Sequence, residues 1–182
     1  MIAKQHIHEA GSALHLAFLK ERLDSRTWET QVEMIHALGL IGNHDALDSI
    51  YDIVLGNKEH DMLTIAAATA YCRLARKSQN DVGPVLKLIE NGGFSVVTGA
   101  FQAVGCDRMI PSREEILRIL EYAVRFDHVT GYGDPRYGVA VAAAGWDGIE
   151  TNRFLQACLT SKDSGVRQAA KSSMEKKYIK CR

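Results

Sequence analysis

Hydrophobic residues recur at helical spacing along almost the whole chain, and no segment shows the sustained alternation of a strand. Residues 113–125 are typical, because Ile116, Ile119, Leu120 and Ala123 fall on one helical face while charged residues fill much of the rest. This pattern predicts an all-α protein. The expected helices cover residues 2–23, 27–41, 45–56, 61–77, 82–91, 94–106, 113–125, 136–146, 150–161 and 164–178.

Local signals mark where several of these helices begin and end. Ser112 and Glu115 have the spacing of a capping box, in which each side chain bonds the backbone of the other residue. Pro84 stands in a first turn, where a missing N–H is tolerated. Gly42-Asn43 ends one helix, and Asp45 is expected to cap the next.

A short motif with a small central residue returns at a near-constant interval. The segment 35–39 (IHALG) reappears at 101–105 (FQAVG) and at 141–145 (VAAAG). The central residues are Ala37, Ala70, Ala103, Ala143 and Ser173, which gives steps of 33, 33, 40 and 30 residues. Such intervals are typical of stacked repeats, in which helix pairs that cannot bury their own faces share one core.

The repeats predict the architecture. We expect a right-handed α-α superhelix, a short solenoid of about five helix pairs forming a single domain over residues 1–182. Residues 1–25 would form an N-terminal capping helix and residues 164–182 a polar C-terminal cap. Small residues at the recurring positions let neighbouring helices approach closely.

Several short segments of the sequence resemble those of a known family. Ala37-Leu38-Gly39 is followed by Ile41-Gly42 and Asp45-Ala46-Leu47, and Val166-Arg167 precedes Ala169-Ala170. These steps resemble short HEAT repeats of the kind found in bilin-lyase-like proteins, over most of residues 26–178. The resemblance implies an α-solenoid. HEAT repeats serve scaffolds, inhibitors, lyases and a few DNA-repair enzymes, so the resemblance leaves the function open.

The overall composition limits the classes of function. The chain has 182 residues, with 22 basic and 22 acidic side chains and a formal net charge of zero. A protein that binds nucleic acid mainly through phosphates is usually basic, so we expect no nucleic-acid partner. The four cysteines form no CxxC pair, and we expect reduced thiols. No targeting or membrane-spanning segment stands out, which predicts a cytoplasmic protein.

The candidate chemistry is sparse. His6, His8 and His15 cluster near the start of the chain, but they lack the spacing of a metal motif such as HExxH. We therefore expect no metal, no other cofactor and no catalytic residue. Trp146-Asp147 could serve a DNA-glycosylase-like solenoid as a stacking ring and a carboxylate. The simpler interpretation is a tryptophan that seals a joint between helices.

The 40-residue step contains an insertion over residues 126–138. Insertions in repeat proteins map to loops, often on a binding face. The candidate partner-binding residues lie in the 127–137 loop of this insertion and are Tyr132, Asp134, Arg136 and Tyr137, since tyrosine and arginine are enriched at binding hot spots. The alternative is a plain connector. Arg136 is expected to be presented to a partner and to matter little for stability.

The second helix of each pair usually lines the concave face of such a solenoid. These helices are residues 45–56, 82–91, 113–125 and 150–161, and they carry the further candidates Asp48, Asp52, Arg118, Arg125 and Arg153. Charge is also uneven, because residues 153–182 are basic while residues 45–52 are acidic. An oppositely patterned protein could be steered to such a surface.

These features favour a non-enzymatic solenoid that binds another protein. It would act as an adaptor or as a cytoplasmic inhibitor of the immunity or antitoxin type, and as a monomer or a weak dimer. The alternatives are a DNA-binding or DNA-glycosylase-like HEAT solenoid and a bilin-lyase-like subunit. A glycosylase would need a continuous basic groove beside a carboxylate, and a lyase would need an aromatic pigment cavity.

Overall fold

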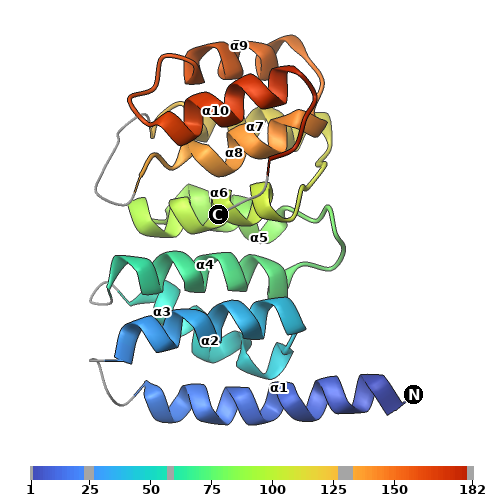
Figure 1. Ribbon diagram of the computed structural model, residues 1–182, viewed down its shortest axis with the longest axis vertical. Coiled ribbons are helices and arrows are strands. Elements are labelled where there is room, and N and C mark those ends of the chain that lie inside the picture. The colour runs from blue at the N-terminus through green and yellow to red at the C-terminus, as the bar shows by residue number, and fades with distance from the viewer. Residues whose placement is uncertain (1, 23–26, 57–59, 127–132, 180–182) are drawn as a thin grey trace. The chain divides into compact units, whose positions relative to one another are not determined.

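The computed structural model describes residues 2–22, 27–56, 60–126 and 133–179, and within these ranges the protein is all-α, as predicted (Figure 1). Ten α-helices in these ranges pack mostly on their neighbours in sequence. None of them is both long and apolar enough to cross a bilayer. The contacts divide the chain into two compact units, Met1–Ala75 and Arg76–Arg182. The single domain with capping segments at 1–25 and 164–182 stays a prediction.

The first unit contains four helices, α1 (Ile2–Glu21), α2 (Trp28–Ile41), α3 (Leu47–Leu55) and α4 (Asp61–Ala75). Helix α4 packs against both α2 and α3, and α1 packs against α2. Gly39 on α2 lies close to α4, since a Cβ placed there would meet the Ala70 Cβ at 3.0 Å. The largest fully buried side chains of this unit come from all four helices: Phe18, Ile35, Leu38, Ile50, Ile53, Leu63 and Leu74.

The turn between α2 and α3 differs in one detail from the prediction. Gly42 follows α2 with φ of 77°, a left-handed conformation that suits glycine. Asn43, rather than Asp45, then caps the short 3₁₀ turn His44–Ala46, because its side-chain oxygen accepts the backbone N–H of Ala46 at 3.2 Å. Asn43 is buried while Asp45 is exposed, so the cap falls on the residue that needs a partner.

The second unit contains six helices, which are α5 (Gly83–Asn91), α6 (Phe94–Cys106), α7 (Arg113–Ala123), α8 (Arg136–Ala142), α9 (Ile149–Cys158) and α10 (Ser164–Met174). Helices α6 and α8 form its most extensive pair, and α10 packs against α8 and α9. The α6–α8 crossing is tight: a Cβ on Gly105 would lie 2.4 Å from the Gly138 carbonyl oxygen.

Four of the five recurring small residues, Ala70, Ala103, Ala143 and Ser173, are buried, whereas Ala37 is half-buried.

Two local predictions about helix ends in this unit are confirmed. Ser112 caps α7 through a complete capping box with Glu115, and Pro84 stands in the first turn of α5. The last helix is shorter than the expected 164–178. It ends at Met174 because Lys176 adopts a left-handed backbone with φ of 56°, which cannot continue a right-handed helix.

The cysteines agree only in part with the prediction of reduced thiols. Cys72 and Cys158 are buried and form no disulfide bond, as predicted. Burial raises the pKa of the Cys158 thiol to about 12, so this sulfur is a weak nucleophile at neutral pH. Cys106 is disulfide-bonded, so the prediction is wrong at this position. Cys181 lies outside the described residues.

Candidate protein-binding groove

Helices α7 and α9 contact each other within the second unit (Figure 1). Side chains of these two helices line an open groove. Its volume is about 310 Å³. Leu120 and Phe154 form a buried floor, while Leu117 and Val124 remain 38% and 53% exposed. Glu121, Glu150, Arg153 and Ala157 complete the lining.

The groove follows from the spacing of side chains on the two helices. On α7 the lining residues Leu117, Leu120 and Val124 are separated by three and four residues, so they share one helical face. On α9 the residues Glu150, Phe154 and Ala157 have the equivalent spacing of four and three.

Polar groups surround this apolar floor. Glu121 and Arg125 form an ion pair one helical turn apart at 2.5 Å, and the Arg125 guanidinium lies 4.7 Å from the centre of the Tyr122 ring. Arg118 forms an ion pair with Glu90 of α5. Arg153 lines the groove itself. The groove therefore combines apolar contact area with charges of both signs.

Three of the arginines predicted to bind a partner thus lie on or beside the groove. Arg118, Arg125 and Arg153 are all exposed on α7 or its following turn and on α9. Asp48 and Asp52 are also exposed, on α3 of the first unit. Their role in binding stays a prediction.

The insertion loop gives a different result from the one expected. Asp134 and Arg136 are only 4% and 8% exposed, and their side chains form an ion pair with Arg136 Nη2 at 2.5 Å from Asp134 Oδ2. The same carboxylate accepts the Ser161 hydroxyl at 2.7 Å and the Arg136 backbone N–H at 3.0 Å. The expectation that Arg136 is presented to a partner is wrong in this structure, because its guanidinium is buried at the start of α8.

The other two loop candidates have separate outcomes. Tyr137 is half-buried, and its ring packs beside Gly165 at the start of α10, where an added Cβ would lie 3.5 Å away. Tyr132 and residues 127–131 lie outside the described residues. Residues 133–137, at the C-terminal end of the insertion, therefore connect the start of α8 to the turn between α9 and α10.

Trp146 does not present its ring for stacking on a base. It is 1% exposed, and its indole Nε1 donates a hydrogen bond of 2.8 Å to the Met109 carbonyl oxygen. Asp147 is exposed and pairs with Lys176 at 2.8 Å, and the hydrogen bond from Lys176 lowers the carboxyl pKa. The joint-sealing interpretation of Trp146 is confirmed.

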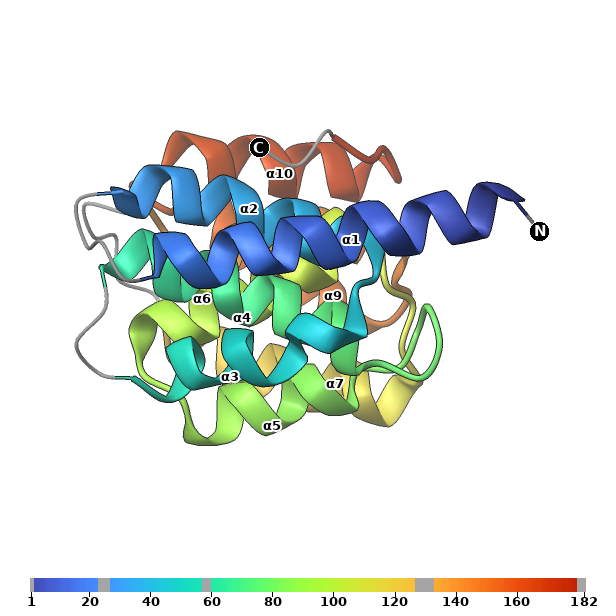
Figure 2. The ribbon, with the colours of Figure 1, turned by 90° about the horizontal axis from the view of Figure 1, so that it is seen from below.

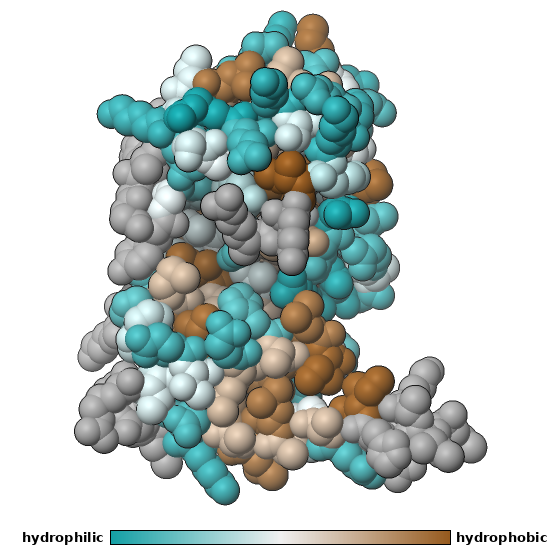
Figure 3. Space-filling model, in the orientation of Figure 1, coloured by the Kyte–Doolittle hydropathy of each residue, from teal (hydrophilic) through white to brown (hydrophobic). Residues whose placement is uncertain are grey.

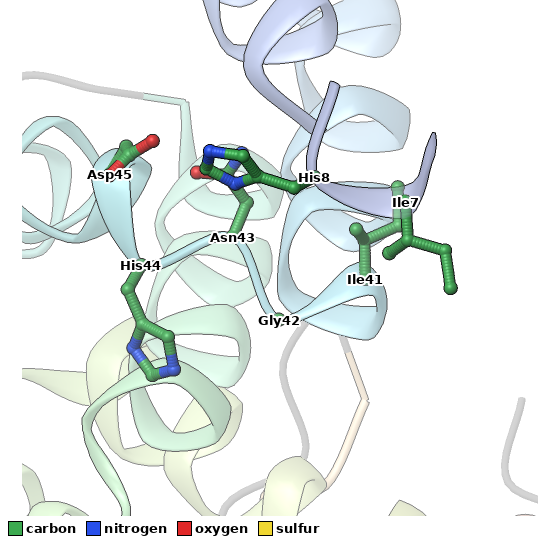
Figure 4. A pocket seen from close by; sticks show the side chains of 7 residues that line it. All are labelled: Ile7, His8, Ile41, Gly42, Asn43, His44 and Asp45. Atoms are coloured by element: carbon green, nitrogen blue, oxygen red, sulfur yellow. The ribbon is translucent and has the colours of Figure 1, made fainter. Parts of the chain in front are cut away.

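A second hollow lies in the first unit, between the start of α1 and the turn after α2 (Figure 4). Its volume is about 270 Å³, and it is lined by Ile7, His8, Ile41, Gly42, Asn43, His44 and Asp45. Figure 4 shows the His44 ring directed away from His8. In the described part of the chain, no three histidine, cysteine or carboxylate side chains converge as a metal site would require.

The hydrophobic pattern of the sequence does not by itself predict the apolar part of the groove. Leu117 and Val124 are apolar residues that lie outside the buried stripe of Ile116, Ile119 and Leu120. Their position off the buried face was the one feature of the sequence that pointed to an apolar surface here. An isolated exposed leucine is common, however. The packing of α7 beside α9 is what turns these two side chains into one surface.

Comparison with protein-family models, with curated proteins and with solved structures finds no match for this chain. The resemblance to HEAT repeats therefore rests on the sequence pattern. The geometry of the groove is the main guide to function.

Proposed function

We propose that this protein is a non-enzymatic, HEAT-like α-solenoid that binds another protein, as an adaptor or as an inhibitor of the immunity type. Helices that pack on their neighbours in sequence, with small residues at the tight crossings, support the repeat architecture. The close approach of Gly105 and Gly138 is an example. An architecture of this kind offers extended surfaces and leaves specificity to the side chains on them.

The single observation that carries the binding function is the α7–α9 groove. Leu117 and Val124 expose apolar surface directly above the buried Leu120 and Phe154. Large exposed apolar patches rimmed by polar residues mark interaction sites, and the groove has this arrangement on a small scale. An apolar side chain of a partner would fill the groove and displace water from both leucines and the valine.

The charged rim would orient that partner. Arg153 and Glu150 stand on the α9 side, and Glu121 stands on the α7 side. Rim charges contribute more to association rate and specificity than to affinity. Binding energy would therefore be concentrated on the apolar floor, and the charges would select the partner.

Site-specific crosslinking in the native cell tests this proposal. A photoreactive amino acid at Leu117 should crosslink to one partner protein, because Leu117 lies in the groove. The same probe at Ile110, which is 52% exposed in the second unit outside the groove, serves as the matched control. Crosslinks from both positions to the same set of proteins would contradict a specific groove.

Substitution completes the test. Leu117→Asp combined with Val124→Asp should weaken capture of the crosslinked partner at least tenfold, with the melting temperature little changed because both side chains are exposed. Ile110→Asp should retain full capture. Equal capture by all three proteins would exclude the groove as the interface.

A further inference from the structure

The hollow in the first unit, between the start of α1 and the turn after α2, contains a buried hydrogen-bond donor. Asn43 lines this hollow and is only 6% exposed. Its side-chain oxygen accepts the Ala46 N–H, but among the described residues nothing accepts a hydrogen bond from its side-chain nitrogen, Nδ2. Buried N–H groups are almost always paired with protein, water or ligand. The Nδ2 group therefore takes its partner from outside the chain.

The space around this donor depends on Gly11 of α1. A Cβ placed on Gly11 would lie 2.6 Å from Asn43 Nδ2, so a larger residue would press on the amide nitrogen. Figure 2 shows the turn that leads into α3 emerging beside the N-terminal half of α1. The hollow has a volume of about 270 Å³, several times the roughly 30 Å³ that one water molecule takes. It has room for a small organic molecule.

The lining of the hollow has three chemically different parts. Ile7 and Ile41 lie at one side of the view in Figure 4, and Asp45 lies at the other. Asn43 and His8 lie between them, and both offer N–H donors, because an imidazole ring carries at least one N–H. Figure 3 shows apolar residues gathered over α1 and the end of α2, beside the isoleucines. The order is therefore apolar surface, hydrogen-bond donors and negative charge.

We propose that this hollow binds a free aliphatic α-amino acid. The carboxylate of the ligand accepts hydrogen bonds from Asn43 Nδ2 and from the His8 ring. Its ammonium group pairs with Asp45, and its side chain covers Ile7 and Ile41. An amino acid carries these three groups on one carbon atom, which suits a lining in which Asn43 and Asp45 are two residues apart.

Simpler ligands match the lining less well. An inorganic anion would accept from Asn43 but would be repelled by the nearby Asp45 carboxylate. A hydrocarbon would cover the isoleucines but would leave the buried N–H of Asn43 without an acceptor. Only a ligand with an acceptor, a positive charge and an apolar group matches all three parts.

The exposure of the hollow limits the affinity. Every lining residue except Asn43 is exposed, so part of the ligand stays in water and the ion pair with Asp45 is weak. We expect a dissociation constant of roughly 0.1–10 mM. This inference uses the first unit alone and does not depend on the α7–α9 groove.

Titration of the full, isotope-labelled chain with L-leucine, followed by proton–nitrogen correlation NMR, tests the proposal. The side-chain NH₂ signals of Asn43 should shift and saturate, because Nδ2 gains an acceptor. Three probes each lack one group: L-leucinamide lacks the carboxylate, N-acetyl-L-leucine the ammonium and glycine the side chain. Each should bind at least fivefold more weakly than leucine. Equal binding of any of them, or Asn43 signals that do not saturate by about 50 mM leucine, would overturn the proposal.

Two substitutions test the polar contacts. Asn43→Asp keeps an oxygen for the Ala46 N–H but removes the donor, so it should weaken leucine binding at least tenfold. Asp45→Asn should weaken binding several-fold, and because Asp45 is exposed this variant remains informative if Asn43→Asp unfolds. Glu29→Gln is the matched control, since Glu29 is exposed on α2 outside the hollow. Unchanged binding in either folded test variant, or an equal loss in the control, would contradict the site.

Discussion

The crossing of α6 and α8 provides a demanding test of the packing. A Cβ added at Gly138 would lie 2.0 Å from the Phe101 carbonyl oxygen and 2.8 Å from the Gln102 backbone nitrogen. These are main-chain atoms of α6, so no side-chain rotation can relieve the clash. To reach an ordinary contact of 3.4 Å, the two helices must separate by more than 1 Å.

That separation determines the expected cost of Gly138→Ala. A gap of about 0.5–1 Å already removes a quarter to a half of the dispersion energy of each contact along the crossing. Overpacking of this kind costs about 1–3 kcal/mol or more, and the clash with backbone favours the upper end. The better helix propensity of alanine returns up to about 1 kcal/mol. We expect a net loss of about 2–4 kcal/mol, or roughly 5–15 °C in melting temperature.

Thermal and urea unfolding followed by circular dichroism measure this loss. Gly93→Ala is the control, because nothing lies within 4 Å of its added Cβ and its φ of −74° suits alanine. The control should stay within about 1 kcal/mol of the wild type. A Gly138→Ala protein as stable as this control would show that α6 and α8 do not cross at Gly138 in solution.

Substitutions of two ionisable side chains, Asp134 and His36, should change the stability of the protein according to how each side chain is buried and paired. Asp134→Ala leaves the buried Arg136 guanidinium without its carboxylate and should cost about 3–5 kcal/mol, whereas replacing both residues by Leu and Met should cost less. Equal melting temperatures for wild type and Asp134→Ala in calorimetry would refute the buried pair. Burial, and then the Arg73 charge, lower the pKa of His36 below 6.5. The unfolded chain then binds a proton at His36 more readily than the folded chain does. The contribution of His36 to the stability of the folded protein is therefore present above pH 6.5 and declines as pH falls toward the folded pKa. His36→Gln should therefore lose less stability than the wild type between pH 7.5 and 5.5 in urea titrations, and an equal loss would contradict this.

The sequence alone determined the helical class and several helix ends, because these depend on residues close together in the chain. Ser112 and Glu115 are three residues apart, so their capping box forms within one turn. The sequence also predicted that Ala70, Ala103 and Ala143 lie at contacts between helices, because these small residues recur within apolar helices. All three are buried.

Only the tertiary structure decided the environment of the candidate functional residues. Arg136 looked like a residue available to a partner, but Ser161, 25 positions later in the chain, joins it and Asp134 in a buried network. Leu117 and Val124 became a groove only because α9 packs beside α7. Burial and partner choice at these positions depend on contacts between distant segments. Hydrophobic periodicity records which face of a helix turns inward, but it carries no information about which other helix meets that face.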